Sequence, residues 1–353
     1  MNKFENRVRK FQNLMLEKKI DGCMIRTLPS FRYFTGVGWW QPSLYIPALD
    51  VPTIFAFEDE VEEIKEKTWI ENVKGYRKVE ELMKSVVKVI KESKAETLGF
   101  DLDIDASAAL YQMFLYMHGD KKIVDVHNLI MELRMVKDLE EIQLIKKASE
   151  IAKEALKTAL NSVKPGVTET EVAGEAVYKA RKMGAESIHI YVNAGKPRIH
   201  AHPRNKKVNV GDTVMIDVMP QYEGYYSDKA NTTFMEPIDK EKKKAYQAFQ
   251  EALEECAESL KPELSMKDIE EKARKIYEKY DLIKYYVYGF GHGVGLRFEE
   301  DPITTIVVAH RLMKIKENMV LNLGHAPLSG KNLGAIKIEE TYLVSKEGAG
   351  KLT

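Results

Sequence analysis

The sequence Val214-Met-Ile-Asp-Val218 decides much of the fold, together with the turn Glu223-Gly224 and the run Tyr225-Tyr-Ser-Asp-Lys-Ala-Asn-Thr-Thr233 that follow it. An apolar run, a turn and a second run rich in aromatic and β-branched residues predict an antiparallel hairpin. If the turn is tight, residue 219 lies opposite residue 228, and residue 217 points to the same face as residue 219. Asp217 and Asp228 then become diagonal neighbours.

Diagonal cross-strand neighbours lie roughly 7 to 8 Å apart at the backbone, so their side chains can converge on one ion. A carboxylate inside an apolar strand also needs a cation or hydrogen-bond donors. The hairpin therefore predicts that Asp217 and Asp228 hold a metal. Two solvated strand residues, or anchors of the turn, are the alternative interpretation.

Amphipathic helices flank this hairpin. An apolar stripe begins near Leu139 and ends at Pro165-Gly166, and a capping box formed by Thr168 and Glu171 opens the next helix, which Gly184 should end. Strands are expected at Ile188–Val192, Thr213–Val218 and Tyr225–Met235, helices at Lys240–Leu260 and Met266–Lys279, and further strands after them. This order favours an α+β domain in which helices cover one face of a curved, mostly antiparallel sheet.

The first 125 residues or so follow a different pattern, in which short apolar runs alternate with amphipathic stretches. This alternation predicts an α/β domain. Its expected strands are Cys23–Ile25, Thr53–Phe57 and Leu98–Phe100, and its expected helices are Glu60–Lys67 and Glu80–Lys94.

Composition excludes several classes of function. The 353 residues suffice for two domains, and 54 basic residues balance 54 acidic ones, which disfavours a nucleic-acid or membrane-surface partner. The sequence has no run of membrane-spanning length and no apolar leader at its start. Only two cysteines, Cys23 and Cys256, occur, as a reduced compartment permits. We therefore expect a soluble cytoplasmic protein.

Two histidines and a glutamate complete the candidate site. His292 lies within Gly289-Phe-Gly-His-Gly-Val-Gly295, which matches neither G-x-G-x-x-G nor a Walker loop, so an imidazole held against a metal or substrate is favoured over a phosphate cradle. A glycine-rich turn with an incidental histidine is the alternative. Glu339 lies in a predicted strand, Ala335–Ser345, which carries one acid on each face and is uninformative by itself. His325 follows the apolar strand Met319–Leu323, a place where a histidine is more often structural than a ligand.

Carboxylates mixed with imidazoles suit Mn, Fe, Co or Zn. Two such ions a few Å apart could bind a bridging hydroxide that attacks a carbonyl carbon. We therefore expect one or two divalent metal ions as cofactor.

Ordered motifs along the chain resemble the pita-bread hydrolases, a family that includes prolidase, aminopeptidase P and creatinase. These motifs are Tyr33-Phe-Thr-Gly36, Leu133-Arg-Met-Val-Lys137 with Glu141-Ile142, Asp217 with Ser227-Asp228, Gly291-His-Gly-Val-Gly-Leu296 and Lys337-Ile-Glu-Glu-Thr341. The resemblance implies a creatinase/prolidase-like α/β domain over residues 1–127 and a pita-bread catalytic domain, of α+β class, over residues 128–353. It also implies a homodimer, for which Trp39 and Trp40 offer a candidate contact.

The family's five metal ligands are two aspartates, a histidine and two glutamates, and the resemblance assigns Asp217, Asp228, His292 and Glu339 to four of them. The other glutamate has no direct match. Counting back fourteen residues from Glu339 reaches His325, whereas counting forward from Met319 reaches Gly324. His325 is thus the predicted fifth ligand, with a missing ligand as the alternative.

Three further positions carry predicted roles through the same resemblance. His200 matches the histidine that lies over the substrate in prolidases and creatinase, and is predicted to bind substrate and to donate a hydrogen bond in catalysis. His202 is close enough to share the substrate-binding role. Glu299 stands where the family often has a second histidine, so Glu299 and His292 are also predicted to be catalytic. Asn231 replaces an arginine that commonly follows the second aspartate.

The predicted function is a metal-dependent hydrolase that cleaves Xaa-Pro bonds of dipeptides or short peptides through a metal-bridged hydroxide. The altered fifth ligand leaves two alternatives open. One is a creatinase-like or other non-peptidase C–N hydrolase or lyase on the same fold, and the other is a catalytically silent binding protein.

Overall fold

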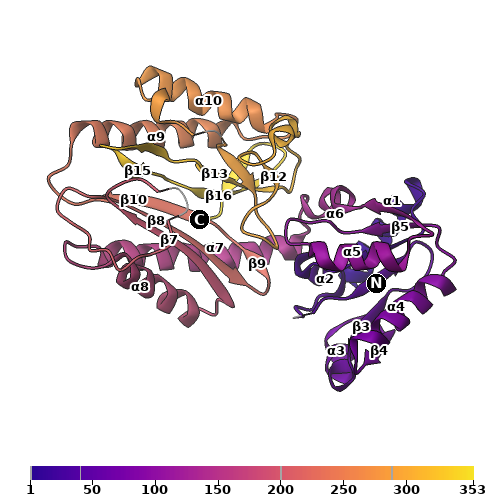
Figure 1. Ribbon diagram of the computed structural model, residues 1–353. Helices are drawn as coiled ribbons and strands as arrows, with labels where there is room; N and C mark the ends of the chain where they lie inside the picture. The colour runs from indigo at the N-terminus through magenta and orange to yellow at the C-terminus, as the bar shows by residue number, and fades with distance from the viewer. Residues whose placement is uncertain (1, 40, 199–200, 288) are drawn as a thin grey trace. The chain divides into compact units, whose positions relative to one another are not determined.

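The computed structural model describes residues 2–39, 41–198, 201–287 and 289–353. The chain divides into two compact units, Met1–Arg134 and Met135–Thr353, coloured from indigo to magenta and from magenta to yellow in Figure 1. The predicted boundary after residue 127 falls at the start of helix α6 (His127–Arg134) and stays a prediction. Within the described ranges, no helix is both long enough and apolar enough to cross a lipid bilayer.

The first unit is built on one six-stranded mixed sheet in the order β4-β3-β2-β1-β5-β6. Its strands are β1 (Gly22–Ile25), β2 (Leu44–Pro47), β3 (Thr53–Phe57), β4 (Val73–Tyr76), β5 (Thr97–Phe100) and β6 (Lys122–Asp125). Its other α-helices are α1 (Lys3–Glu17), α2 (Leu28–Thr35), α3 (Val61–Lys67), α4 (Val79–Glu92) and α5 (Ala108–Met117). The predicted α/β class is confirmed, and the three predicted strands match β1, β3 and β5.

In its described residues, the second unit contains four long α-helices and mostly antiparallel strands. The helices are α7 (Leu139–Ser162), α8 (Glu169–Lys182), α9 (Lys240–Ser259) and α10 (Met266–Lys279). A four-stranded sheet contains β7 (Ser187–Ala194), β8 (Thr213–Tyr222), β9 (Tyr225–Tyr226) and β10 (Lys229–Phe234). A five-stranded sheet contains β11 (Gly291–Gly293), β12 (Glu300–Ile303), β13 (Val320–Leu323), β16 (Glu340–Val344) and β17 (Ala349–Lys351), and β14 (Leu328–Gly330) pairs with β15 (Gly334–Ile336).

The strands of this unit lie between the α7–α8 pair and the α9–α10 pair (Figure 1). The apolar stripe of α7 packs with α8 on β7 and β8, where Ile151, Ala155, Val172 and Ile216 share one core. The predicted α+β class is therefore confirmed, and so is the capping box of Thr168 and Glu171. The prediction of a single sheet covered by helices on one face is wrong, because the strands divide into separate sheets and helices lie on two sides of them.

The register of the central hairpin agrees with the sequence. Lys229 pairs with Val218 and Tyr226 pairs with Gln221, so one continuous register runs on both sides of Asp228. The tight turn at Glu223-Gly224, where both residues have positive φ, sets this register. Asp217 and Asp228 consequently occupy the predicted relation.

The predicted strand Ala335–Ser345 is divided. It forms β15 and β16, and residues 337–339 between them leave both strands. Glu339 makes a reciprocal backbone bridge with Ala230 of β10, with N to O distances of 3.0 and 3.1 Å. Since Ala230 also pairs with Asp217, this bridge carries Glu339 to the central hairpin.

Glu169 at the start of α8 anchors the segment that follows β7. Its buried carboxylate accepts hydrogen bonds from Arg198 Nη2 (3.0 Å), Arg204 Nε (3.0 Å) and the Ala194 backbone N–H (2.9 Å). Burial raises the pKa of Glu169, but the Arg204 and backbone hydrogen bonds outweigh it and hold the pKa below the usual range. The segment from Arg198 to Arg204, which includes two predicted substrate-binding positions, is thus tied at both ends to one carboxylate.

We expect Glu169→Gln to lower the free energy of unfolding at neutral pH by about 1 to 3 kcal/mol, because charge-assisted hydrogen bonds are lost while the partly exposed arginines remain hydrated. A depressed carboxylate pKa adds stability above the unfolded-state pKa, and that stability is lost as pH falls. The difference between variant and wild type should therefore shrink in acid. Urea unfolding from pH 7 down to about pH 3, below the ordinary pKa of a glutamate, measures it, with exposed Glu175→Gln as control. A constant difference across this range contradicts the assignment.

Candidate metal centre

Four elements of the second unit bring the predicted acidic and imidazole side chains together. Asp217 lies in β8, Asp228 lies between β9 and β10, His292 lies in β11, and Glu339 bridges to β10. All four side chains are buried. His325 follows β13, where Gly324 has a φ of 95° and passes so close to the Ile338 carbonyl that a Cβ atom would clash.

The separations among Asp228, His292 and Glu339 suit ligands of one small cation. His292 Nε2 lies 3.5 Å from Asp228 Oδ2 and 3.4 Å from Glu339 Oε1. His325 Nδ1 lies 3.2 Å from the same Glu339 oxygen. Ligands at 2.0 to 2.1 Å around a tetrahedral centre are separated from one another by about 3.3 Å. The observed separations fit that geometry.

The polar atoms of this cluster are also incompletely satisfied. Nδ1 of His292 lies 2.9 Å from the Gly293 carbonyl oxygen, which directs Nε2 toward the carboxylates. Within the described part of the chain, buried His292 Nε2, Asp228 Oδ1 and Asp217 Oδ1 have no hydrogen-bond partner. Buried polar atoms without partners are costly, and a cation would satisfy these atoms at once. The donor set therefore fits a divalent metal ion.

When no cation is bound, the buried carboxylates of the cluster repel one another, and burial and these charges shift the pKa values of the side chains. Burial, together with Glu339 and Asp217, raises the pKa of Asp228 well above its ordinary value. Burial lowers the pKa of His292, but Asp228 and Glu339 outweigh it and raise that pKa well above the usual range. In the metal-free protein, Asp228 and His292 therefore hold protons more strongly, and these protons offset the negative charge of the buried carboxylates as a cation would.

Lys337 also enters the cluster, although no site role was predicted for it from the sequence. Its Nζ lies 2.6 Å from Asp217 Oδ2 and also pairs with Glu339 Oε2. Burial raises the pKa of Glu339, but Lys337 and then His292 outweigh it and hold that pKa well below its ordinary value. The available signal was the position of Lys337 two residues before Glu339, which places alternate side chains on one side of an extended segment.

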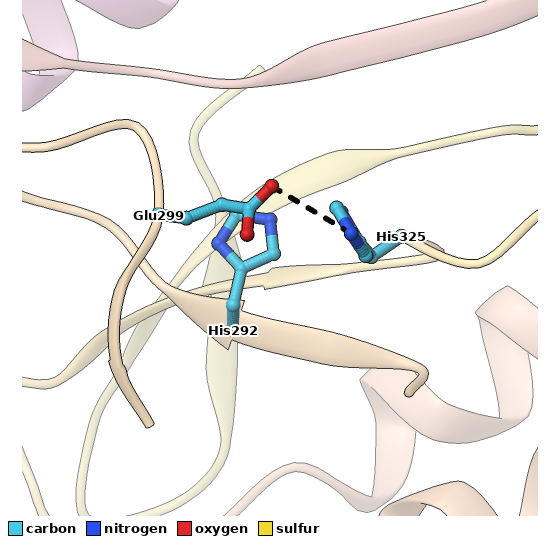
Figure 2. A group of neighbouring side chains, drawn as sticks. All are labelled: His292, Glu299 and His325. Carbon is cyan, nitrogen blue, oxygen red and sulfur yellow. Dashed lines mark ion pairs between the residues drawn. The ribbon is translucent and has the colours of Figure 1, made fainter. Parts of the chain in front are cut away.

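Glu299 and His325 meet at the edge of the cluster, as Figure 2 shows. His325 Nε2 lies 3.6 Å from Glu299 Oε1, and the His325 and His292 rings stand edge to face at 4.7 Å. Burial raises the pKa of Glu299, whereas His292 and His325 lower it, with a net decrease. His292, Glu299 and His325 form a second possible ligand group that shares His292 with Asp228 and Glu339.

The predicted substrate-binding residues differ in their placement. His200 lies outside the described residues. His202 is exposed and lies outside both ligand groups, with its ring 5.6 Å from His189 and 5.3 Å from Tyr191. The His189 ring in turn stacks on Phe298 at 5.2 Å, next to Glu299 in the chain. Sequence reasoning missed these aromatic side chains, since no local motif links β7 to residue 298.

Comparisons with known proteins identify the class of enzyme that this fold and site define. Residues 143–346 match the model of metallopeptidase family M24, and residues 7–136 match the creatinase/prolidase N-terminal domain. The chain belongs to metallopeptidase family M24. Membership in this family implies the use of a divalent metal.

Particular relatives resemble the chain over nearly its whole length. It is 29% identical to a Xaa-Pro dipeptidase from Pyrococcus furiosus, with 99% of this chain and 98% of that protein covered. It is 30% identical to an uncharacterized peptidase from Methanocaldococcus jannaschii, with 99% and 95% covered. The crystal structure of the prolidase from Pyrococcus horikoshii OT3 superposes with a TM-score of 0.90 at 27% identity, covering 99% of this chain and 98% of that one. The predicted pita-bread fold is confirmed.

Proposed function

We propose that this protein is a metal-dependent hydrolase that cleaves Xaa-Pro peptide bonds of dipeptides or short peptides. The observation that carries the proposal is the buried group Asp228, His292 and Glu339, extended by His325, with separations of 3.2 to 3.5 Å between potential ligand atoms. Named relatives with the Xaa-Pro dipeptidase activity support the choice of substrate.

In the proposed site, the ligands of the cation or cations are Asp228, His292, His325 and Glu339. Asp217, which pairs with Lys337, is a further ligand on the side where Lys337 lies. Mn, Co, Fe and Zn are the candidate ions, because the donors combine carboxylate oxygen with imidazole nitrogen. A bound divalent ion supplies an activated water and polarises the scissile carbonyl group. The proposed site binds one or two of these ions.

The surrounding residues receive separate roles. Glu299 is ionised and partly exposed beside His325, so we propose that it accepts a proton at the mouth of the site. Lys337 holds Asp217 and Glu339 in place. It is the main cause of the lowered pKa of Glu339, whereas burial still raises the pKa of Asp217. We propose that His200 and His202 contact the substrate from the segment anchored by Glu169.

An activity assay after removal of metal tests the proposal. Protein stripped with a chelator should be inactive on Xaa-Pro dipeptides, and adding Mn or Co should restore turnover in proportion to the bound ion measured by mass spectrometry. Matched dipeptides with alanine in place of proline should react much more slowly. Metal-restored protein that hydrolyses creatine, or another C–N compound, and leaves every Xaa-Pro dipeptide intact contradicts the proposed substrate.

His325→Ala is expected to weaken metal binding by about 100-fold or more, because even groups that only orient a ligand contribute 10- to 100-fold. Isothermal titration of stripped protein measures this. His202→Ala is the comparison, since its exposed ring lies outside both ligand groups and its loss should leave metal affinity unchanged. His325→Glu should raise the number of bound ions by adding a carboxylate. Unaltered affinity in His325→Ala contradicts the ligand role.

We also propose that the chain forms a homodimer, as expected from the resemblance to its family. Light scattering at micromolar concentration should report twice the chain mass of 40.4 kDa. A mass of one chain contradicts the proposal. The assay applies equally to metal-free and metal-loaded protein.

A further inference from the structure

The first unit contains a cavity that the proposed catalysis does not use. Its volume is about 480 Å³, within the range of about 300 to 1,000 Å³ that is typical of ligand sites. Helices α4 and α5 form its walls, and the ends of β1, β3, β4 and β5 form its floor. The space opens to solvent on one side, and an apolar recess of this size on a sheet face suggests an occupant.

The walls are apolar and adaptable. Four methionines line the cavity, namely Met24, Met83, Met113 and Met117. Helix α5, Ala-Ala-Leu-Tyr-Gln-Met-Phe-Leu-Tyr-Met, is apolar on nearly every side, yet Phe114 is its only buried residue. Unbranched, polarizable methionine side chains suit a flexible hydrocarbon chain.

The polar groups of the cavity gather at one end. Arg26 follows β1, and Tyr76 is the last residue of β4, so both lie at the carboxyl edge of the parallel strands. The Tyr76 hydroxyl donates a hydrogen bond to Gln41 Oε1 at 3.4 Å. This edge of an open α/β sheet is where such folds commonly bind ligands.

Arg26 lacks a counter-charge among the residues that the structure describes. No carboxylate lies within ion-pair distance of it, and its Nε is buried without a hydrogen-bond partner. A guanidinium stays charged in proteins, so it cannot avoid this cost by losing its proton. A ligand anion would supply the missing partner.

We propose that this cavity binds a small molecule with an apolar chain and a carboxylate head, with Arg26 paired to the carboxylate and the methionines around the chain. The planar guanidinium matches both oxygens of a carboxylate. One negative charge balances the single Arg26, whereas a doubly charged phosphate would bring an uncompensated charge into apolar surroundings. All of its lining residues belong to the first unit.

Titration calorimetry of the full chain with decanoate, below its micelle-forming concentration, tests this inference. We expect saturable binding of one decanoate per chain. Decanol, which lacks the carboxylate, and acetate, which lacks the apolar chain, should both bind much more weakly. Arg26→Gln should weaken decanoate binding by roughly 10- to 100-fold, the effect of losing a charged hydrogen-bonded pair, and should leave decanol binding unchanged. Arg77→Gln, an exposed arginine of the same unit, is the matched control.

A second variant separates ligand binding from folding. Met113→Trp should fill the cavity and abolish binding of both decanoate and decanol, while thermal unfolding stays cooperative. Decanoate binding that is absent, or that is equal in Arg26→Gln and wild type, overturns the proposal. So does a change in mass by light scattering in Met113→Trp, because the surface would then be a contact between two copies.

Discussion

Asp228→Asn should lose its tightly bound metal and more than about 100-fold of its kcat/KM on Xaa-Pro dipeptides. The carboxylate is buried, and its Oδ2 is 3.5 Å from His292 Nε2. An amide oxygen carries no charge, so it binds a hard cation more weakly. Loss of a residue that only orients a ligand already costs 10- to 100-fold, and a direct ligand should cost more.

The same variant should be folded and, without metal, at least as stable as wild type. Burial raises the pKa of Asp228, and the neighbouring charges of Glu339 and Asp217 raise it further, so an ionised Asp228 is unfavourable in the metal-free protein. The asparagine removes that charge. Asp239→Asn is the control, because Asp239 caps α9 at the surface and asparagine caps helices equally well. Metal analysis and steady-state kinetics measure the outcome. Undiminished metal content and turnover would contradict the metal site.

Lys337→Met should destabilise the metal-free protein by about 3 to 5 kcal/mol near pH 8. The substitution leaves Asp217 and Glu339 buried without their ammonium partner, and breaking a buried ion pair costs this much. Burial lowers the pKa of Lys337, but the carboxylates of Asp217 and Glu339 outweigh it and raise that pKa. Wild-type Lys337 is therefore charged throughout the neutral range.

Two conditions should reduce this cost. As pH falls toward 5, the unpaired carboxylates take up protons, so the difference in unfolding free energy from wild type should decrease. Added divalent metal supplies positive charge to the same oxygens and should also reduce the difference. Urea unfolding with and without metal measures both effects, with Lys337→Arg as the control that keeps the charge. A small, pH-independent difference would contradict the role of Lys337.

Local pattern was enough for most of the fold. Periodicity and terminal residues predicted two of the helices. Helix α7 has an apolar stripe and is followed by Pro-Gly, and helix α8 begins with a capping box. The hairpin register followed from the turn at Glu223-Gly224. The single strand over Ala335–Ser345 was wrong, because the backbone of Glu339 pairs with Ala230, more than a hundred residues away.

By itself, the sequence determined the two-domain class, the central hairpin and the set of candidate ligands, because these depend on periodicity, turn chemistry and motif order. Only the tertiary structure decided that Lys337 enters the cluster, that Glu299 meets His325 and that Arg26 faces a cavity. Such contacts join side chains from separate elements, whose directions are set where the elements pack. The spacing of residues along one segment carries no information about that packing.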